Sequence, residues 1–408
     1  MATATPERVP LAEVRDLISL GHPLPFRVLD EHARLLLGKG QQVVSESQLT
    51  MLLERGAWVE RDQVVVVRSQ RDAAAASGGK VPSARHLTLF DRWEKQVWDF
   101  DALQRRIGKF RDLVPDIEEL ADGFIGLVDR DPDVALFNAV RRDDRRFALY
   151  ALTHSLHVAV LGILTGRLLG WEPTQVQTVT RAALTMNVST IELQAILAEQ
   201  DTPPNNRQRE LIRSHPQRST QLLKESGVTD AEWLAAVDDH HEQSDGAGYP
   251  RGIKEVSDLA RVLRAADVYM AKISPRAQRS PLVPQVAARQ LFQQEQGGAI
   301  ATAMVRAIGI YPPGDVVQLR SGEVAVVTRR AAKGPAPLAA SVSNRHGVPV
   351  FETFKRNTAE PDHAIAGPAT TAQLSALPRL LPERFYGLIP GWPEPQADAA
   401  DPTQSRPA

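Results

Sequence analysis

Two adjacent histidines, His240 and His241, begin the segment of this sequence whose residue types are best suited to chemistry. The segment reads His-His-Glu-Gln-Ser-Asp-Gly-Ala-Gly-Tyr-Pro and ends at Pro250, with one carboxylate on each side of Ser244. Imidazole is the commonest metal ligand among side chains, and histidines beside carboxylates suit a borderline transition metal. The alternative, a polar helix end with solvated histidines, explains the His-His pair but not the glycines and the proline that follow. The segment therefore predicts a metal site.

A helix must lead into this segment and end within it. Apolar residues at helical spacing precede the histidines, and residues that stop a helix follow them. These residues are Trp233, Leu234 and Val237 before the histidines, and Gly246, Gly248 and Pro250 after them. Adjacent residues of a regular helix point about 100° apart, so neighbouring histidines can enter one small site only where the helix frays. We therefore expect His240 and His241 at a helix end that opens into a fixed loop.

Composition limits the classes of protein to which the chain can belong. Its 408 residues, 43% of them hydrophobic, suffice for two or three domains. A formal net charge of −1 gives no field that would select nucleic acid or an anionic membrane as a partner. The chain has no cysteine, which leaves His, Asp and Glu as metal ligands. It begins without the features of a signal peptide and no apolar run reaches the length of a membrane span, so a cytoplasmic protein is expected.

The segment from His240 to Pro250 resembles the signature of the HD-GYP family, a branch of the HD phosphohydrolase superfamily, which reads His-His-Glu-x-x-Asp-Gly-x-Gly-Tyr-Pro. Members of this family are all-helical, bind two or three iron, manganese or related ions, and hydrolyse the bacterial second messenger cyclic di-GMP. The resemblance implies a mainly α fold with an HD-type helical bundle as its core. It also implies nucleotide contacts from four residues, Gly248, Tyr249, Pro250 and Arg276. For Arg276, a solvated surface arginine is the alternative.

Further residues match metal-ligand positions of the same family. His154 lies on the apolar face of a helix expected from Tyr150 to Gly170, although a histidine on such a face is more often part of the core. His215 stands in a His-Pro pair after an arginine-rich helix. Asp267 matches a ligand position and could also position the metal or a water molecule; an ion pair with Arg264 or a helix cap is the alternative. The implied metal set is thus His154, His215, His240, His241 and Asp267.

The sequence departs from the family where an apolar-His-Asp-x-Gly-Lys motif should end the helix that starts at Pro173. Met186 and Asn187 stand in place of the His and Asp, and Thr190 in place of the Lys. Two dications about 4 Å apart repel each other by on the order of 16 kcal/mol at an effective dielectric near 20, and the neutral Asn187 cannot offset this as a bridging aspartate does. Met186 offers a soft thioether that suits neither iron nor manganese. A binuclear centre is therefore not expected.

A reduced metal site remains open on the residues that are retained. Three imidazoles suffice for a mononuclear site, so His215, His240 and His241 could hold one divalent iron or manganese ion. The site could equally hold no metal.

The order of elements predicts a small α+β N-terminal domain over residues 1–70. Its expected elements are a strand over Leu35–Leu37 that enters a Gly-Lys-Gly turn, a helix from Ser45 to Gly56, and a short buried strand over Val64–Val67. Residues 71–88, which contain an alanine run followed by Ser-Gly-Gly, are expected to form a flexible linker.

The rest of the chain divides into four expected segments. Residues 89–145 read as an amphipathic helical connector, either a dimer stalk or a cover on the catalytic bundle. Residues 146–312 carry the HD-GYP resemblance. Residues 313–360 show alternating apolar residues around Ser321-Gly322, typical of a hairpin in a small β module. Residues 361–408 are expected to be irregular and largely disordered.

Two functions of different classes follow. The first is a catalytically impaired HD-GYP-type protein that binds cyclic di-GMP or a related nucleotide, or that binds another signalling protein such as a diguanylate cyclase with a GGDEF domain. The second is an active, metal-dependent cyclic di-GMP phosphodiesterase with a reduced metal site. A phosphohydrolase for another nucleotide is a third reading, under which the Gly-Tyr-Pro loop would be incidental. A homodimer is compatible with each of them.

Overall fold

The structure is a computed structural model of the chain. It describes residues 7–377, together with residues 385–386, apart from short internal segments. The segments left out are residues 31–32, 34, 44–48, 50–51, 54–55, 77–87, 142–149, 278–279, 332–335 and 351–352.

The core is a helical bundle built around one central helix, α6 (Tyr150–Leu168). Apolar side chains lie on nearly all sides of α6 and are buried, which is the pattern of a helix that is surrounded by others. Its neighbours are α5 (Pro132–Val140), α7 (Pro173–Thr185), α11 (Asp258–Ile273) and α13 (Ala299–Ile308). Gly170, with φ of +75°, follows the end of α6 as the sequence predicts.

Further helices complete the bundle in the order α8 (Ile191–Glu199), α9 (Asn206–Glu225), α10 (Ala231–Asp239) and α12 (Pro284–Gln294). Helix α10 packs against both α7 and α9, and α11 packs against α6, α7 and α10. The chain is thus mainly α with a helical bundle as its core, as expected. None of the helices that the structure describes is both long enough and apolar enough to cross a membrane.

The expected connector over residues 89–145 is not one helix but three, α3 (Leu89–Gln104), α4 (Val114–Arg130) and α5. Positive φ angles at Gly108 and Asp112 turn the chain between α3 and α4, and Asp131 and Pro132 start α5. Helix α3 packs on α4 and α6, and the Gln104 side chain donates to the Leu184 carbonyl at 3.2 Å. These helices therefore cover the bundle, in agreement with the second of the two expected arrangements.

A small sheet with order β1-β4-β2-β3 forms the N-terminal part. Its strands are β1 (Arg8–Pro10), β2 (Val28–Leu29), β3 (Leu35–Leu37) and β4 (Trp58–Glu60), with a 3-10 helix, η1 (Leu11–Leu17), after β1. The strand over Leu35–Leu37 and its glycine turn are confirmed, and Gly40 has φ of +87°. Of the predicted helix, Leu49, Leu52 and Leu53 are helical, whereas Ser45 lies outside the described residues.

The predicted strand over Val64–Val67 is wrong, because these residues belong to α2 (Arg61–Ala76). Val64 is buried and Val67 packs against the same core three residues later, while Val65 and Val66 are 62% and 50% exposed. This i, i+3 spacing is that of a helix, and a run of four valines does not reveal it from sequence alone. Helix α2 also occupies residues 71–76 of the expected linker, and residues 77–87 lie outside the described part of the chain.

A five-stranded antiparallel sheet with order β8-β7-β6-β5-β9 forms the C-terminal part. The predicted hairpin is confirmed: β5 (Val316–Leu319) pairs with β6 (Val324–Arg329) through a turn in which Gly322 has φ of +89°. β7 (Leu338–Ser341) follows. The next strand is β8 (Lys355–Asn357), and an isolated bridge between Ser343 and Pro349 precedes it.

The prediction of an irregular chain from residue 361 is wrong for the part that the structure describes. A 3-10 turn, η3 (Pro361–His363), leads into β9 (Ile365–Pro368), which pairs with β5, and α14 (Thr371–Ala376) follows. Phe385 is buried against Phe137, and the Tyr386 hydroxyl donates to the Thr328 carbonyl at 2.8 Å. Residues from 387 onward lie outside the described part. The β-branched alternation that marks a strand is weak in Ile-Ala-Gly-Pro, so β9 escapes detection.

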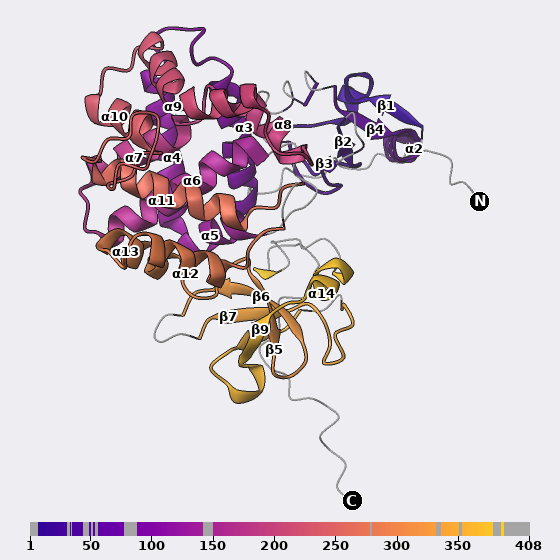
Figure 1. The fold of residues 1–408 in the computed structure, drawn as a ribbon. Helices are drawn as coiled ribbons and strands as arrows, with labels where there is room; N and C mark the ends of the chain where they lie inside the picture. The colour runs from indigo at the N-terminus through magenta and orange to yellow at the C-terminus, as the bar shows by residue number, and fades with distance from the viewer. Residues whose placement is uncertain are drawn as a thin grey trace, which may run out of the picture.

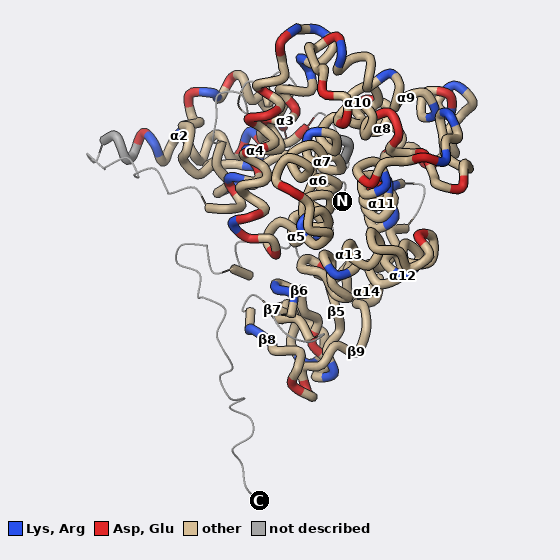
Figure 2. Tube along the Cα trace, turned by 90° about the vertical axis from the view of Figure 1, so that its left-hand side faces the viewer, with Lys and Arg blue, Asp and Glu red and all other residues tan. Residues whose placement is uncertain are grey.

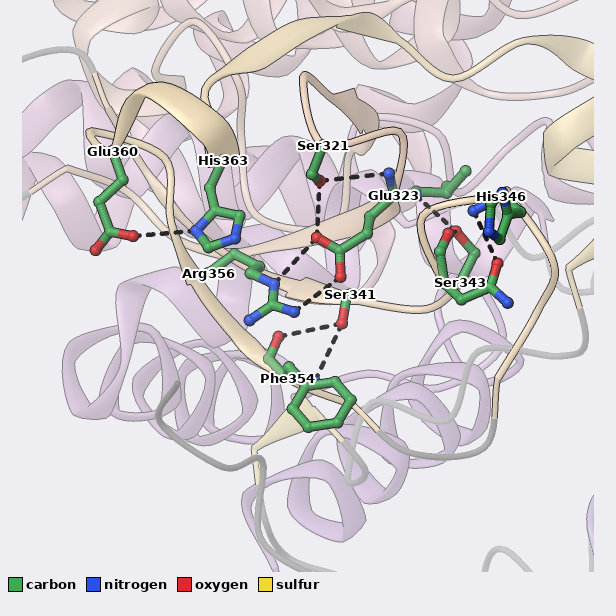
Figure 3. A network of polar contacts seen from close by, with 11 residues as sticks. Ser321, Glu323, Ser341, Ser343, His346, Phe354, Arg356, Glu360 and His363 are labelled. Carbon is green, nitrogen blue, oxygen red and sulfur yellow. Dashed lines mark hydrogen bonds and ion pairs between the residues drawn. The ribbon is translucent and has the colours of Figure 1, made fainter. Parts of the chain in front are cut away.

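A buried ion pair closes the C-terminal sheet (Figure 3). Arg356 of β8 binds both carboxylate oxygens of Glu323, at 2.8 and 3.1 Å, and the Ser321 hydroxyl donates to the same carboxylate. Glu323 is 4% exposed, and these donors lower the pKa of its carboxyl although burial alone would raise it. All of these contacts lie within the β module, which makes this network structural.

The sheet is joined to the helical core by a second set of ion pairs. Arg329 contacts Asp131 at the start of α5, and Arg330 contacts Asp133 at 2.6 Å and the Ala307 carbonyl at 2.6 Å. Figure 1 shows this sheet and the N-terminal sheet at different edges of the bundle. Acidic and basic side chains are interspersed over the helices in Figure 2, as the near-zero net charge leads one to expect.

Candidate metal centre

Three histidines from two helices meet inside the bundle. His215 lies in α9, His240 is the C-cap of α10, and His241 is the next residue. One ligand nitrogen from each lies within 4.8 Å of the other two. His240 is fully buried and His215 is 3% exposed. As the sequence predicts, the end of α10 allows the two adjacent histidines to enter one site.

His215 and His240 point the same ring nitrogen at each other. Nδ1 of His215 lies 2.6 Å from the Ile212 carbonyl, and Nδ1 of His240 lies 2.7 Å from the Val237 carbonyl. Since a carbonyl only accepts, both rings carry their proton on Nδ1. The two Nε2 atoms then face each other at 3.0 Å with lone pairs and no hydrogen between them. Such a pair is repulsive alone and is suited to sharing a cation.

The sequence reading placed His215 after the arginine-rich helix, and this detail is wrong. Helix α9 continues through His215 and Pro216 to Glu225. A proline inside a helix is disfavoured, which is why the sequence suggested a helix end there. The side chain of His215 consequently has the fixed direction of a helical residue.

His241 joins the cluster from the loop side. Its ring stacks on Tyr249 with a centroid distance of 4.6 Å and an angle of 25° between the ring planes. Its Nδ1 lies 4.0 Å from a carboxylate oxygen of Asp267 on α11. Burial raises the pKa of the Tyr249 phenol, so Tyr249 stays neutral and acts as a flat wall beside the imidazole.

Asp267 binds His154 and not Arg264. The other carboxylate oxygen of Asp267 lies 2.7 Å from Nε2 of His154 in α6, whereas Arg264 pairs with Glu295 at 3.0 Å. Asp267 lies in the middle of α11, so a capping role is also excluded. Both alternatives considered from sequence are therefore wrong. The structure places the His154–Asp267 pair beside the three-histidine cluster, through His241, and not within it.

Burial and mutual repulsion keep the clustered histidines neutral. Burial, followed by the neighbouring His240, lowers the pKa of His215 from 6.5 to about 3. Burial also lowers the pKa values of His240 and His241, in the second case well below the usual range. For Asp267, the hydrogen bond and charge of His154 overcome burial and hold its carboxyl pKa far below the usual range. Three neutral imidazoles beside a carboxylate are in the protonation states that metal binding requires.

These pKa shifts predict acid sensitivity of the metal-free protein. The unfolded chain takes up a proton on His215 near pH 6.5 but the folded chain only near pH 3, so stability present above pH 6.5 is lost as the pH falls towards 3. The expected loss for His215 between pH 6.5 and pH 4 is about 3 kcal/mol. Urea unfolding between pH 7 and pH 4 measures it. A His215→Gln variant should show a shallower slope, and an equal slope in both proteins would contradict the assignment.

The loop after the histidines is held by Glu242, a role that the sequence analysis missed. This carboxylate is 1% exposed and accepts the backbone N–H groups of Arg251, Gly252 and Ile253 at 2.7 to 3.2 Å. The Arg251 side chain in turn contacts Asp238 and Asp239 at the end of α10. Both carboxylate oxygens of Glu242 thus accept hydrogen bonds that shape the loop, and Glu242 is not a metal ligand. The position of Glu242 between the histidines and the glycines is the sequence feature that could have indicated this role in the loop.

Gly248 is required by close packing in this loop. A Cβ atom there would lie 2.4 Å from the Glu242 Cα and from the Gln243 nitrogen. Gly248→Ala is therefore expected to destabilise the protein by about 2–3 kcal/mol, because backbone must move. The matched control is Gly126→Ala in the exposed interior of α4, where a Cβ meets nothing within 4 Å and a gain of up to about 1 kcal/mol is expected. Thermal unfolding of both variants tests this; equal melting temperatures would count against it.

Met186, Asn187 and Thr190 lie in a segment that contacts His215 through Ser189. Met186 is the C-cap of α7 and is fully buried, Asn187 is 2% exposed and Thr190 is 6% exposed. The neighbouring Ser189 hydroxyl donates to the His215 carbonyl at 3.1 Å. Nδ2 of Asn187 has no hydrogen-bond partner among the described residues. The segment that carries Met186 and Asn187 is thus linked to the cluster through the backbone of His215.

Arg276 and the remaining loop residues complete the set considered from sequence. Arg276 is half-buried, three residues beyond the end of α11, beside Ala277, whose N–H donates to the Ala198 carbonyl of α8. Gly248, Tyr249 and Pro250 are half-buried in the loop that stacks on His241. The donor set of the cluster, three imidazoles with a carboxylate beside them, fits a divalent transition metal.

This chain is similar to known proteins in three comparisons. A model of a family described as "HD domain" matches residues 143–298. The "Cyclic di-GMP phosphodiesterase PA4108" of Pseudomonas aeruginosa is 35% identical over 121 residues, which are 29% of this chain and 29% of that protein. The matched part is therefore less than a third of the length of that curated relative. A solved structure, "Bd1817, a HDG"Y"P protein from Bdellovibrio bacteriovorus", is 16% identical with a TM-score of 0.47 and covers 74% of this chain and 98% of that one. Residues 143–298 are thus similar to an HD domain, and the histidine cluster lies inside them.

Proposed function

We propose that this protein is an HD-GYP-type signalling protein that binds cyclic di-GMP or a related nucleotide at a single-metal site and hydrolyses it poorly or not at all. The observation that carries the proposal is the pair of facing Nε2 atoms of His215 and His240, together with the buried, uncharged Met186 and Asn187 at the positions of the family's His-Asp pair. The facing Nε2 atoms support one bound cation. Asn187 stands in place of the carboxylate that two neighbouring cations need.

In this proposal His215, His240 and His241 hold one divalent iron or manganese ion. The ion, when bound, would supply positive charge to a phosphate oxygen. Asp267, ionised and bonded to His154, lies 4.0 Å from Nδ1 of His241 and acts on this ring through its charge, not as a metal ligand. Tyr249, Gly248 and Pro250 form the wall against which the nucleotide lies, and Arg276 is assigned to its phosphate.

Metal-dependent binding of the nucleotide tests this function. Equilibrium dialysis with cyclic di-GMP should show binding to the manganese-loaded wild-type protein and binding at least tenfold weaker to Tyr249→Ala, which loses the wall beside His241. GTP at the same concentration serves as the competitor. Absence of cyclic di-GMP binding by the metal-loaded protein would overturn the proposed ligand.

An active phosphodiesterase is the second candidate, and one observation favours it. The ionised Asp267 accepts a hydrogen bond from Nε2 of His154, with 2.7 Å between the nitrogen and the oxygen, beside the cluster. Such a pair can accept a proton and return it. A single cation and this pair would then carry the reaction. Formation of the linear dinucleotide by wild-type protein, lost in His154→Gln, would favour this candidate.

A GGDEF-type protein partner remains a proposal of the first reading, to be tested by co-purification with a diguanylate cyclase.

A further inference from the structure

Helix α9 contains a proline directly after a residue of the histidine cluster. Pro216 lies in the interior of the helix, which runs from Asn206 to Glu225 without a break. Proline is the least favourable residue in a helix interior, because it has no N–H and its ring clashes with the carbonyl four residues earlier. A residue so unfavourable at this position calls for a compensating role.

The carbonyl four residues before Pro216 is that of Ile212. In a regular α-helix the N–H of residue 216 would donate to it, but proline has none. Nδ1 of His215 instead lies 2.6 Å from the Ile212 oxygen. Because Pro216 has no N–H, the Ile212 carbonyl is free to accept the hydrogen bond from the imidazole of His215.

The consequence reaches the cluster through the histidine tautomer. A neutral imidazole carries one proton, and the contact of Nδ1 with the Ile212 carbonyl places the proton of His215 on Nδ1. With that proton on Nδ1, Nε2 bears the lone pair, and Nε2 lies 3.0 Å from the Nε2 of His240. In the opposite tautomer, Nε2 would carry a hydrogen and could not bind a metal.

His240 reaches the same tautomer by a different route. It is the C-cap of α10, and its Nδ1 lies 2.7 Å from the Val237 carbonyl in the last turn, where carbonyls lack helical N–H donors. The end of α10 thus leaves a carbonyl free for Nδ1 of His240, as Pro216 leaves one free for Nδ1 of His215 within an unbroken helix. Two unrelated backbone features with one result argue against coincidence.

We propose that Pro216 is a positioning residue: by leaving the Ile212 carbonyl without a backbone donor, it fixes His215 in the Nδ1-protonated tautomer and presents Nε2 to the cluster. The purpose of this tautomer rests on the proposed metal site. The tautomer itself is a property of the metal-free chain and can be measured without metal or nucleotide. The other contacts near His215, from Ser189 to its carbonyl and to Ser219, do not involve either ring nitrogen.

Nitrogen-15 NMR of the histidine side chains in metal-free protein at pH 7 tests the proposal. Long-range proton–nitrogen correlations should show His215 as the Nδ1–H form in wild type. In Pro216→Ala the new backbone N–H bonds the Ile212 carbonyl, and the Nε2–H form of His215 should become the major one. Affinity for Co²⁺, followed by its visible absorption, should fall by about 10- to 100-fold, as for other groups that orient a metal ligand.

Pro284→Ala is the matched control. Pro284 stands at the first turn of α12, where no preceding carbonyl requires its N–H, so the tautomer of His215 should be unchanged. If His215 keeps the Nδ1–H form in Pro216→Ala, the positioning role is overturned whether or not metal binds. If the tautomer changes as predicted but wild-type protein binds no metal, the positioning role stands and the proposed function fails.

Discussion

His240→Ala is expected to remove nearly all bound metal from the protein. His240 is fully buried and supplies the Nε2 atom that faces His215 at 3.0 Å, so its loss breaks the closest donor pair of the cluster. Wild-type protein loaded anaerobically with Mn²⁺ should retain about one ion per chain after gel filtration, and the variant less than about a tenth of that. Elemental analysis by mass spectrometry measures both.

His346→Ala provides the control for this experiment. His346 lies exposed in the β module, so its loss should leave the metal content unchanged. Circular dichroism should show that His240→Ala keeps its helical content, since an alanine at the C-cap disturbs only the last turn of α10. Retention of the full metal content by a folded His240→Ala protein would mean that the metal binds elsewhere.

Restoring the missing pair should convert the site from one ion to two. In Met186→His, Asn187→Asp a carboxylate replaces a neutral amide that is 2% exposed, next to the segment that contacts His215. The added negative charge offsets a repulsion between dications that is on the order of 16 kcal/mol at about 4 Å and an effective dielectric near 20. We expect the metal content to rise to about two ions per chain and cyclic di-GMP hydrolysis to appear.

Met186→His alone separates charge from shape in this test, because the retained Asn187 has the shape of aspartate without its charge. That variant restores the imidazole but not the carboxylate, so it should remain at one ion and without activity. Wild-type protein that already binds two ions would contradict the account of Asn187. A doubly substituted protein that binds two ions without hydrolysis would show that the missing ligands are not the cause of low activity.

The histidine cluster could be predicted from sequence because residue type and local spacing indicate it. His240 and His241 before a run of glycines indicate both a helix end and a cluster of imidazoles, and the structure places them so. The partners of the buried charges could not be predicted in this way. Asp267 lies three residues after Arg264, which suggests a local ion pair, but the fold brings His154 to Asp267 from a distant helix and gives Arg264 to Glu295.

Elements with apolar spacing over many turns could be predicted from sequence. The prediction of elements failed where the apolar pattern covers only a few residues. Helices α6 and α7 follow from many turns of apolar spacing. The four residues of Val64–Val67 fit a strand or a helix, and tertiary packing against the first and fourth of them decides for the helix. Strand β9 depends on pairing with β5, a contact between segments that are far apart in sequence.

Anaerobic incubation of purified protein with cyclic di-GMP and Mn²⁺ or Fe²⁺ is the most direct test of the central claim, that this site holds one ion and lacks efficient hydrolysis. The bound metal and the linear dinucleotide are quantified in the same sample, with His240→Ala as the background. The account predicts about one ion per wild-type chain and no product above that background. Two ions per chain with sustained product formation would contradict it.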